Sequence, residues 1–220
     1  MISFLKRYRH AFLLFAYACI YAPWFIYLER TVTKHYHLIH MKLDDYIPFQ
    51  EFFIIPYFLW FAYVSIVVFY LLFTNKTDYY KNCAFLFIGM TIFLIISTVY
   101  PNGHHLRPVH FERDNIFTHM VASLYRTDTA TNLFPSIHVY NSLGTHFAVC
   151  NNEKLYRHKW IRYGSLILCI SIILSTVFLK QHSVFDVITA FVMATILYIL
   201  VYAIDYSVIG ERRRAKESLS

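Results

Sequence analysis

The sequence predicts an all-α fold, an integral membrane six-helix bundle with both termini on the cytoplasmic side. Of its 220 residues, 58% are hydrophobic and 15% are charged, whereas a soluble domain carries about a quarter charged residues. Apolar blocks recur at helix length, and Lys and Arg gather between alternate blocks. Because the chain has no long repeat and no low-complexity linker, we expect one membrane-embedded domain over residues 1–220.

Six apolar blocks are expected to form the spanning helices, since about 20 apolar residues cross the ~30 Å of hydrocarbon. They run roughly over residues 11–28, 52–73, 83–100, 135–150, 163–179 and 184–204. The first continues without a small-residue cleavage site, which predicts an uncleaved span rather than a signal peptide. The fourth is the shortest and contains His138, Asn141 and His146. This polarity predicts a position inside the bundle, away from lipid.

The distribution of basic residues predicts the orientation, because Lys and Arg concentrate in cytoplasmic loops. With the N-terminus inside, 13 of the 20 Lys and Arg residues are cytoplasmic. They are Lys6, Arg7, Arg9, Lys76, Lys81, Lys154, Arg157, Lys159, Arg162, Arg212, Arg213, Arg214 and Lys216. The outer segments are then residues 29–51, the long loop 101–134 with a short helix near Asn115–Tyr125, and the turn at 180–182. The net charge of +7 therefore indicates membrane topology, and we expect no nucleic-acid partner.

A His–Asp pair bridges the last two spans, in the order Ser175-Thr176-x5-His182-x3-Asp186. On a helix, residues four apart share one face, so Asp186 can accept a proton from one nitrogen of His182. The other nitrogen then keeps its lone pair, as a nucleophilic histidine requires. The alternative interpretation is a structural pair that caps the sixth span.

Two further clusters belong to the same predicted outer face. Pro135-Ser136-Ile137-His138 opens the fourth span, where free backbone N–H groups can bind an anion and His138 can exchange a proton. Arg107 in the long loop offers a planar fork for phosphate oxygens. Each cluster alone also fits a structural role: an ordinary helix start with an interior histidine, or a surface arginine near the headgroups.

Together the three clusters resemble the type 2 phosphatidic acid phosphatase superfamily. Its motifs are Lys-x6-Arg-Pro, Pro-Ser-Gly-His and Ser-Arg-x5-His-x3-Asp, and its membrane members have six helices. The matching positions are Arg107, Pro108, Pro135, Ser136, His138, Ser175, His182 and Asp186. Three positions differ, with Tyr100 at the family lysine, Ile137 at the glycine and Thr176 at the second arginine. The stretch 176–182 also resembles the inositol phosphorylceramide synthase branch, which tends to lack the same arginine.

The resemblance implies phosphoryl transfer on a lipid phosphate at the outer leaflet. His182 would form a phosphohistidine, Asp186 would orient it, and His138 would act as general acid and then base. The implied phosphate-binding residues are Arg107, Ser136, Tyr100 and Lys180. No metal or other cofactor is needed in this scheme. His104, His105, His110 and His119 show no fixed ligand spacing, so no metal site is expected.

The missing lysine and arginine leave two alternatives open. The chain could transfer a phospho-headgroup between lipids, because hydroxyl dipoles suit a monoanionic diester better than a dianionic monoester. It could also be a non-catalytic lipid-binding membrane protein with a weakened site. The partners expected are the lipid phosphate and membrane lipids, while the substrate's identity and the oligomeric state stay open. The small size favours a bacterial plasma membrane, with an extracytoplasmic active site. Asp44 and Asp45 are expected to cap a helix or to contact a headgroup.

Overall fold

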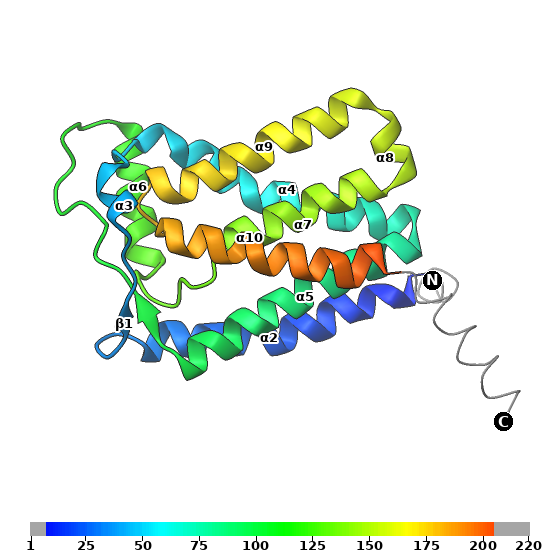
Figure 1. The fold of residues 1–220 in the computed structure, drawn as a ribbon, viewed down its shortest axis with the longest axis horizontal. Coiled ribbons are helices and arrows are strands. Elements are labelled where there is room, and N and C mark those ends of the chain that lie inside the picture. The colour runs from blue at the N-terminus through cyan, green and yellow to red at the C-terminus, as the bar shows by residue number, and fades with distance from the viewer. Residues whose placement is uncertain (1–7, 205–220) are drawn as a thin grey trace, which may run out of the picture.

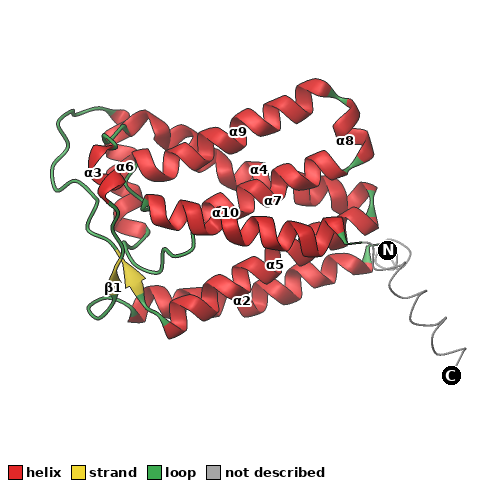
Figure 2. Ribbon diagram, viewed as in Figure 1, coloured by secondary structure: helices red, strands yellow, loops and turns green. Residues whose placement is uncertain are grey.

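The computed structural model describes residues 8–204, and helices make up most of this part (Figures 1 and 2). Its nine α-helices are α2 (Phe12–Thr31), α3 (Lys42–Tyr46), α4 (Ile54–Thr74), α5 (Lys76–Val99), α6 (Ile116–Thr127), α7 (Ile137–Asn151), α8 (Glu153–Arg157), α9 (Lys159–Phe178) and α10 (Val184–Tyr198). Short turns η1 (Arg9–Ala11), η2 (Glu51–Phe53) and η3 (Ile199–Ala203) adjoin them. The helical class is confirmed, apart from one unpredicted pair of two-residue strands.

Five helical segments of residues 8–204 are long and apolar enough to cross a membrane. They are Arg9–Thr31, Glu51–Thr74, Lys76–Val99, Lys159–Phe178 and Val184–Ala203. The fourth predicted span corresponds to α7, whose 15 residues cover only about 22 Å. The six-span count and the orientation therefore stay predictions. The basic residues Lys6 and Arg7, and the cluster from Arg212 to Lys216, lie outside the described residues.

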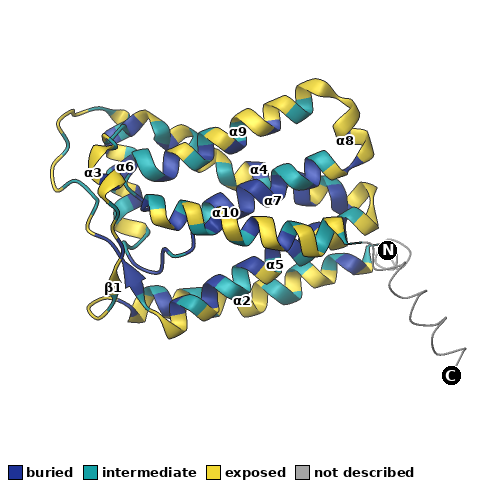
Figure 3. Cartoon of the chain, viewed as in Figure 1, coloured by how far each residue is buried: buried dark blue, intermediate teal, exposed yellow. Residues whose placement is uncertain are grey.

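Helix α7 forms the centre of the bundle and packs against α4, α5, α9 and α10. Figure 3 shows it as the most continuously buried helix. Two glycines allow this close packing: a Cβ at Gly89 of α5 would lie 2.1 Å from the Tyr140 ring, and one at Gly144 would lie 2.5 Å from Phe85. Because neighbouring helices replace lipid around it, α7 can be short and polar.

The loops α2–α4 and α5–α7 meet at one end of the bundle, which we call the outer end (left in Figure 1). There β1 (His37–Leu38) pairs in parallel with β2 (Asn102–Gly103). The Asn102 side chain accepts hydrogen bonds from the N–H groups of Leu133 and Phe134. It thereby fixes the segment that leads into α7. The short helix expected in the long loop is confirmed as α6, which Asn115 caps.

Candidate active site

The turn between α9 and α10 presents His182 beside Asp186. Nδ1 of His182 lies 3.4 Å from Oδ2 of Asp186, and the same oxygen accepts the Ser183 N–H at 3.0 Å. Ser183 caps α10 and forms a capping box with Asp186, which fixes the carboxylate one turn from the histidine. This arrangement leaves Nε2 of His182 as the nitrogen available for attack.

The His182 imidazole is buried at 4% exposure. Burial, together with the positive charge of Arg107, lowers the pKa of His182 to about 3, against an opposing contact with the Leu133 backbone. The ring is therefore neutral at physiological pH, as a nucleophile must be.

His138 projects from the first turn of α7 towards His182, with 5.7 Å between the two ring centroids. Its ring lies between Tyr57 and Trp60 of α4, at centroid distances of 4.6 Å and 4.5 Å. Nδ1 of His138 is buried without a hydrogen-bond partner among the described residues. A neutral imidazole with a free nitrogen can exchange a proton with a bound group.

Ser136 joins the start of α7 to the start of α10. Its Oγ accepts the Val139 N–H at 3.4 Å as the N-cap of α7, and its backbone N–H donates to the Asp186 carbonyl at 3.3 Å. The second and third sequence motifs therefore meet through this backbone contact.

Arg107 lies at the edge of this group and is held mainly by backbone carbonyls. Its guanidinium donates to the carbonyls of Tyr125, Asp128 and Thr129 and to the Gln181 side chain. It also lies over the Tyr125 ring at 4.6 Å. Nε is buried and has no partner within the described part of the chain. Arg107 thus adds positive charge near His182 while most of its donors are already engaged.

Tyr100 and Lys180, both predicted to bind phosphate, make other contacts. Tyr100 is 43% exposed and stacks on His37 with 4.1 Å between centroids. The Nζ of Lys180 donates to the backbone carbonyl of Asp44 at 2.6 Å. Asp44 itself caps α10 through Val184 N–H, so the helix-capping interpretation of Asp44 is confirmed. Whether Tyr100 and Lys180 also bind phosphate stays a prediction.

His104 belongs to the same group, although the sequence marked it only as an unlikely metal ligand. Its Nε2 donates to the Gln181 carbonyl at 2.8 Å, and its Nδ1 accepts the Leu106 N–H at 3.2 Å. Burial lowers the pKa of His104 to about 4, which keeps it neutral. It therefore supports the backbone beside His182. The only sequence signal for it was its place between Tyr100 and Arg107.

An apolar cavity of about 400 Å³ opens beside His138. Aromatic residues of α2 and α4, including Tyr21, Phe25 and Phe61, line much of it, and Asp128 is also among its lining residues. A second cavity of about 270 Å³ continues towards Leu14. The two share Tyr21, Trp60, Met90 and Asn141, so they adjoin each other, and we call them together the apolar groove beside His138. No sequence pattern distinguished its aromatic residues from ordinary span residues.

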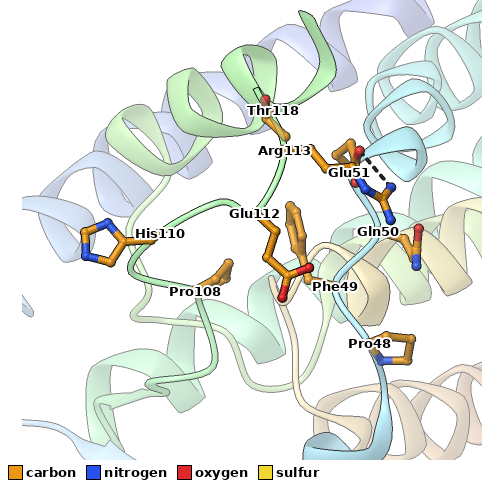
Figure 4. A pocket seen from close by; sticks show the side chains of 9 residues that line it. All are labelled: Pro48, Phe49, Gln50, Glu51, Pro108, His110, Glu112, Arg113 and Thr118. Carbon is orange, nitrogen blue, oxygen red and sulfur yellow. Dashed lines mark hydrogen bonds and ion pairs between the residues drawn. The ribbon is translucent and has the colours of Figure 1, made fainter. Parts of the chain in front are cut away.

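A separate polar hollow of about 320 Å³ lies between the segment 48–51 and the loop 108–113 (Figure 4). Arg113 donates to the buried Glu51 at 3.1 Å across it, and Asn115 donates to the same oxygen. These bonds join the two outer loops. His110 and Glu112 also line the hollow, whereas His138 and His182 do not.

A helical membrane bundle with paired histidines, one of them backed by a carboxylate, defines a candidate phosphoryl-transfer site. A scan against models of protein families matches the PAP2 superfamily over residues 107–208. This match supports membership of the type 2 phosphatidic acid phosphatase superfamily, and the apolar helices are consistent with an integral membrane protein. Members are generally phosphatase-type hydrolases. Searches of curated proteins and of solved structures gave no significant match.

Proposed function

We propose that the chain is a membrane lipid phosphatase or phosphotransferase that works through a phosphohistidine on His182. The observation that carries this proposal is the pair His138–His182, 5.7 Å apart between ring centroids, with Asp186 behind the second ring. A phosphoryl group between the rings would lie within hydrogen-bond reach of both. This pairing also argues against the non-catalytic alternative, which needs no such alignment.

In the first half-reaction, the lone pair on Nε2 of His182 attacks phosphorus, and the bond from phosphorus to the leaving oxygen breaks. His138, protonated when substrate binds, gives its proton to that oxygen, so an alcohol departs. Asp186 accepts a hydrogen bond from Nδ1–H and stabilises the positive charge that develops on the His182 ring. Arg107 Nε and the N–H groups at the start of α7 support the phosphate oxygens.

In the second half-reaction, neutral His138 takes a proton from water, and the water oxygen bonds to phosphorus as the N–P bond breaks. The products are phosphate and free His182. When an alcohol replaces water, the same steps yield a new phosphate ester, so hydrolysis and headgroup transfer share one site. The scheme uses side chains and N–H groups alone, and activity is expected to persist in EDTA.

The apolar groove supports a lipid substrate over a water-soluble ester. Along α2 it extends from Leu14 to Phe25, which is roughly 16 Å at 1.5 Å per residue. This is about half of the ~30 Å hydrocarbon thickness, or one leaflet. One hydrocarbon chain of a lipid in the leaflet at the outer end therefore fits the groove, with its phosphate at the histidines. Combined with the distribution of Lys and Arg, this supports an extracytoplasmic site.

A direct test is to trap the phosphoenzyme. Purified protein incubated with a panel of lipid phosphates is analysed by mass spectrometry for products and for an acid-labile phosphate on the His182 peptide. We expect turnover and labelling in wild type, and neither in His182→Ala. His146→Ala is the matched control and should label normally. Wild-type-like turnover in His182→Ala, or labelling on another residue, would refute the assigned nucleophile.

Headgroup transfer from a phosphodiester is the second candidate, and the charges around the site favour it. Arg107 donates chiefly to carbonyls, and Lys180 is bonded to Asp44. A monoester carries close to two negative charges near neutral pH, since its second pKa is ~6, whereas a diester carries one. A site with few free cationic donors suits the monoanion better.

The charge argument predicts kcat/KM for a diester lipid at least equal to that for a monoester with matched chains. In wild type the Lys180 ammonium is bonded to the Asp44 carbonyl and does not reach the phosphate. Lys180→Met should therefore leave the ratio of the two kcat/KM values unchanged. A strong monoester preference that survives Lys180→Met would return the chain to the simple phosphatase class.

A further inference from the structure

Asp44 is a buried carboxylate of the first outer loop, about 140 residues before the His182 turn in sequence, and the mechanism above does not use it. It lies in the short helix α3 and is 2% exposed. Its Oδ1 accepts the Val184 N–H at 2.7 Å. Its Oδ2 accepts the Ser183 hydroxyl at 2.6 Å and the Met41 N–H at 2.8 Å.

A third link comes from the other side of the turn, where Lys180 donates to the Asp44 carbonyl at 2.6 Å. Asp44 therefore holds the residues on both sides of His182: Lys180 before it, and Ser183 and Val184 after it. We call these three links the Asp44 clasp. Lys180 has φ 52°, a left-handed conformation that a non-glycine residue adopts only when its surroundings hold it.

Other bonds also hold this turn: His104 donates to the Gln181 carbonyl, and Tyr125 donates to the Leu179 carbonyl. The N–H groups of Gln181 and His182 both donate to the Thr176 carbonyl. On its own side of the turn, Asp186 contacts His182 at a distance of 3.4 Å, which is long for a hydrogen bond. The short bonds of the Asp44 clasp are charge-assisted where they involve the carboxylate, and they complete the support of the turn.

We propose that Asp44 is a positioning residue for the His182 nucleophile, an inference that rests on the proposed function. The clasp aligns Nε2 of His182 with the phosphorus atom, and Asp44 itself does not touch substrate. Because reaction rates fall steeply with misalignment, loosening this turn should act on the rate more than on binding.

The neighbouring Asp45 supplies a matched control. It has the same charge, its side chain is 63% exposed, and it bonds to the side chain of His40. In Asp44→Asn, kcat should fall by roughly 10- to 100-fold with KM nearly unchanged, and Asp45→Asn should keep both. Ser183→Ala removes one link of the clasp and should lower kcat by a smaller factor. In the double variant Asp44→Asn/Ser183→Ala, kcat should fall by less than the product of the two single-variant factors.

Two measurements separate positioning from simple loss of folded protein. The burst of phosphoenzyme counts active sites. Full burst amplitude at a lower rate supports the clasp, whereas fewer sites at the wild-type rate would overturn it. Hydrogen exchange of residues 179–184, which needs no activity, should accelerate in Asp44→Asn and not in Asp45→Asn. Unchanged exchange would also overturn the clasp. Absence of a phosphoenzyme in wild type would instead refute the proposed function. In that case the hydrogen-exchange measurement alone would test whether Asp44 holds the turn.

Discussion

His138 and His146 lie on the same helix, about 12 Å apart along α7, and their surroundings differ. Both nitrogens of His146 have partners: Nδ1 with Ser165 Oγ at 3.0 Å, and Nε2 with Cys150 Sγ at 3.5 Å. Nδ1 of His138 has none within residues 8–204, and its ring adjoins His182 and the apolar groove. A buried polar group without a hydrogen-bond partner lowers the free energy of unfolding by about 1–3 kcal/mol.

This difference separates a structural histidine from a chemical one. A buried ring nitrogen without a protein partner can be retained where a bound ligand supplies the missing hydrogen bond. A ring whose two nitrogens are already bonded has none free for substrate. The inner half of α7 is thus part of the packing, and its outer end is part of the site. The following experiments can break or sharpen this division.

The largest effect is expected for His138→Ala. General acid–base catalysis contributes roughly 10²- to 10⁴-fold, so kcat on a lipid phosphate should fall by that amount. An ester whose leaving group needs no proton should still phosphorylate His182, and the phosphoenzyme should then accumulate. Single-turnover kinetics measures both steps. Unchanged kcat would place His138 with His146 as a structural residue.

Filling the groove should have the next largest effect. Ser65 lines its inner part, whereas the adjacent Ile66 is 66% exposed on the same helix. Ser65→Trp should lower kcat/KM for a long-chain lipid phosphate by roughly tenfold, because the chain no longer positions the phosphate. A short-chain ester should react normally, and Ile66→Trp serves as the control. Equal losses for both chain lengths would argue against a chain-binding groove.

His146→Ala should affect stability and leave catalysis nearly intact. Its loss leaves Ser165 with fewer partners, and a lost buried hydrogen bond costs about 1–3 kcal/mol. Thermal unfolding in mild detergent should report the lower stability, while kcat at a temperature where the protein stays folded should remain within about twofold of wild type. A large fall in kcat at full folding would contradict the division between the two histidines.

The smallest effect concerns pH, through His104, whose ring nitrogens are both bonded. Because burial lowers its pKa from 6.5 to about 4, the unfolded chain binds more protons in that interval. Stability from this group is therefore complete above pH 6.5 and is lost as pH falls towards 4. His104→Gln should flatten this part of the stability–pH curve, whereas His105→Gln, in its exposed neighbour, should not. Melting temperatures across pH 4–7 provide the measurement.

Much of the fold was predictable because its signals are local. Helix-length apolar blocks predicted the five long segments, and Asn115 and Ser183 are recognisable caps of α6 and α10. The helix α7, Ile137–Asn151, also follows the predicted short polar block 135–150 closely. The strand pair escaped prediction because two residues per strand carry no periodic pattern.

The sequence by itself determined the class of protein and the residues capable of the chemistry. Motif spacing along the chain indicated His138, His182 and Asp186, although His182 lies in the turn before α10 and not on the same helix as Asp186. The tertiary structure decided which polar atoms remain free: carbonyls hold Arg107, Asp44 holds Lys180, and one nitrogen of His138 has no partner within residues 8–204. These contacts join segments up to 140 residues apart, and a hydrogen bond depends on where packing places its two atoms, which local sequence does not specify.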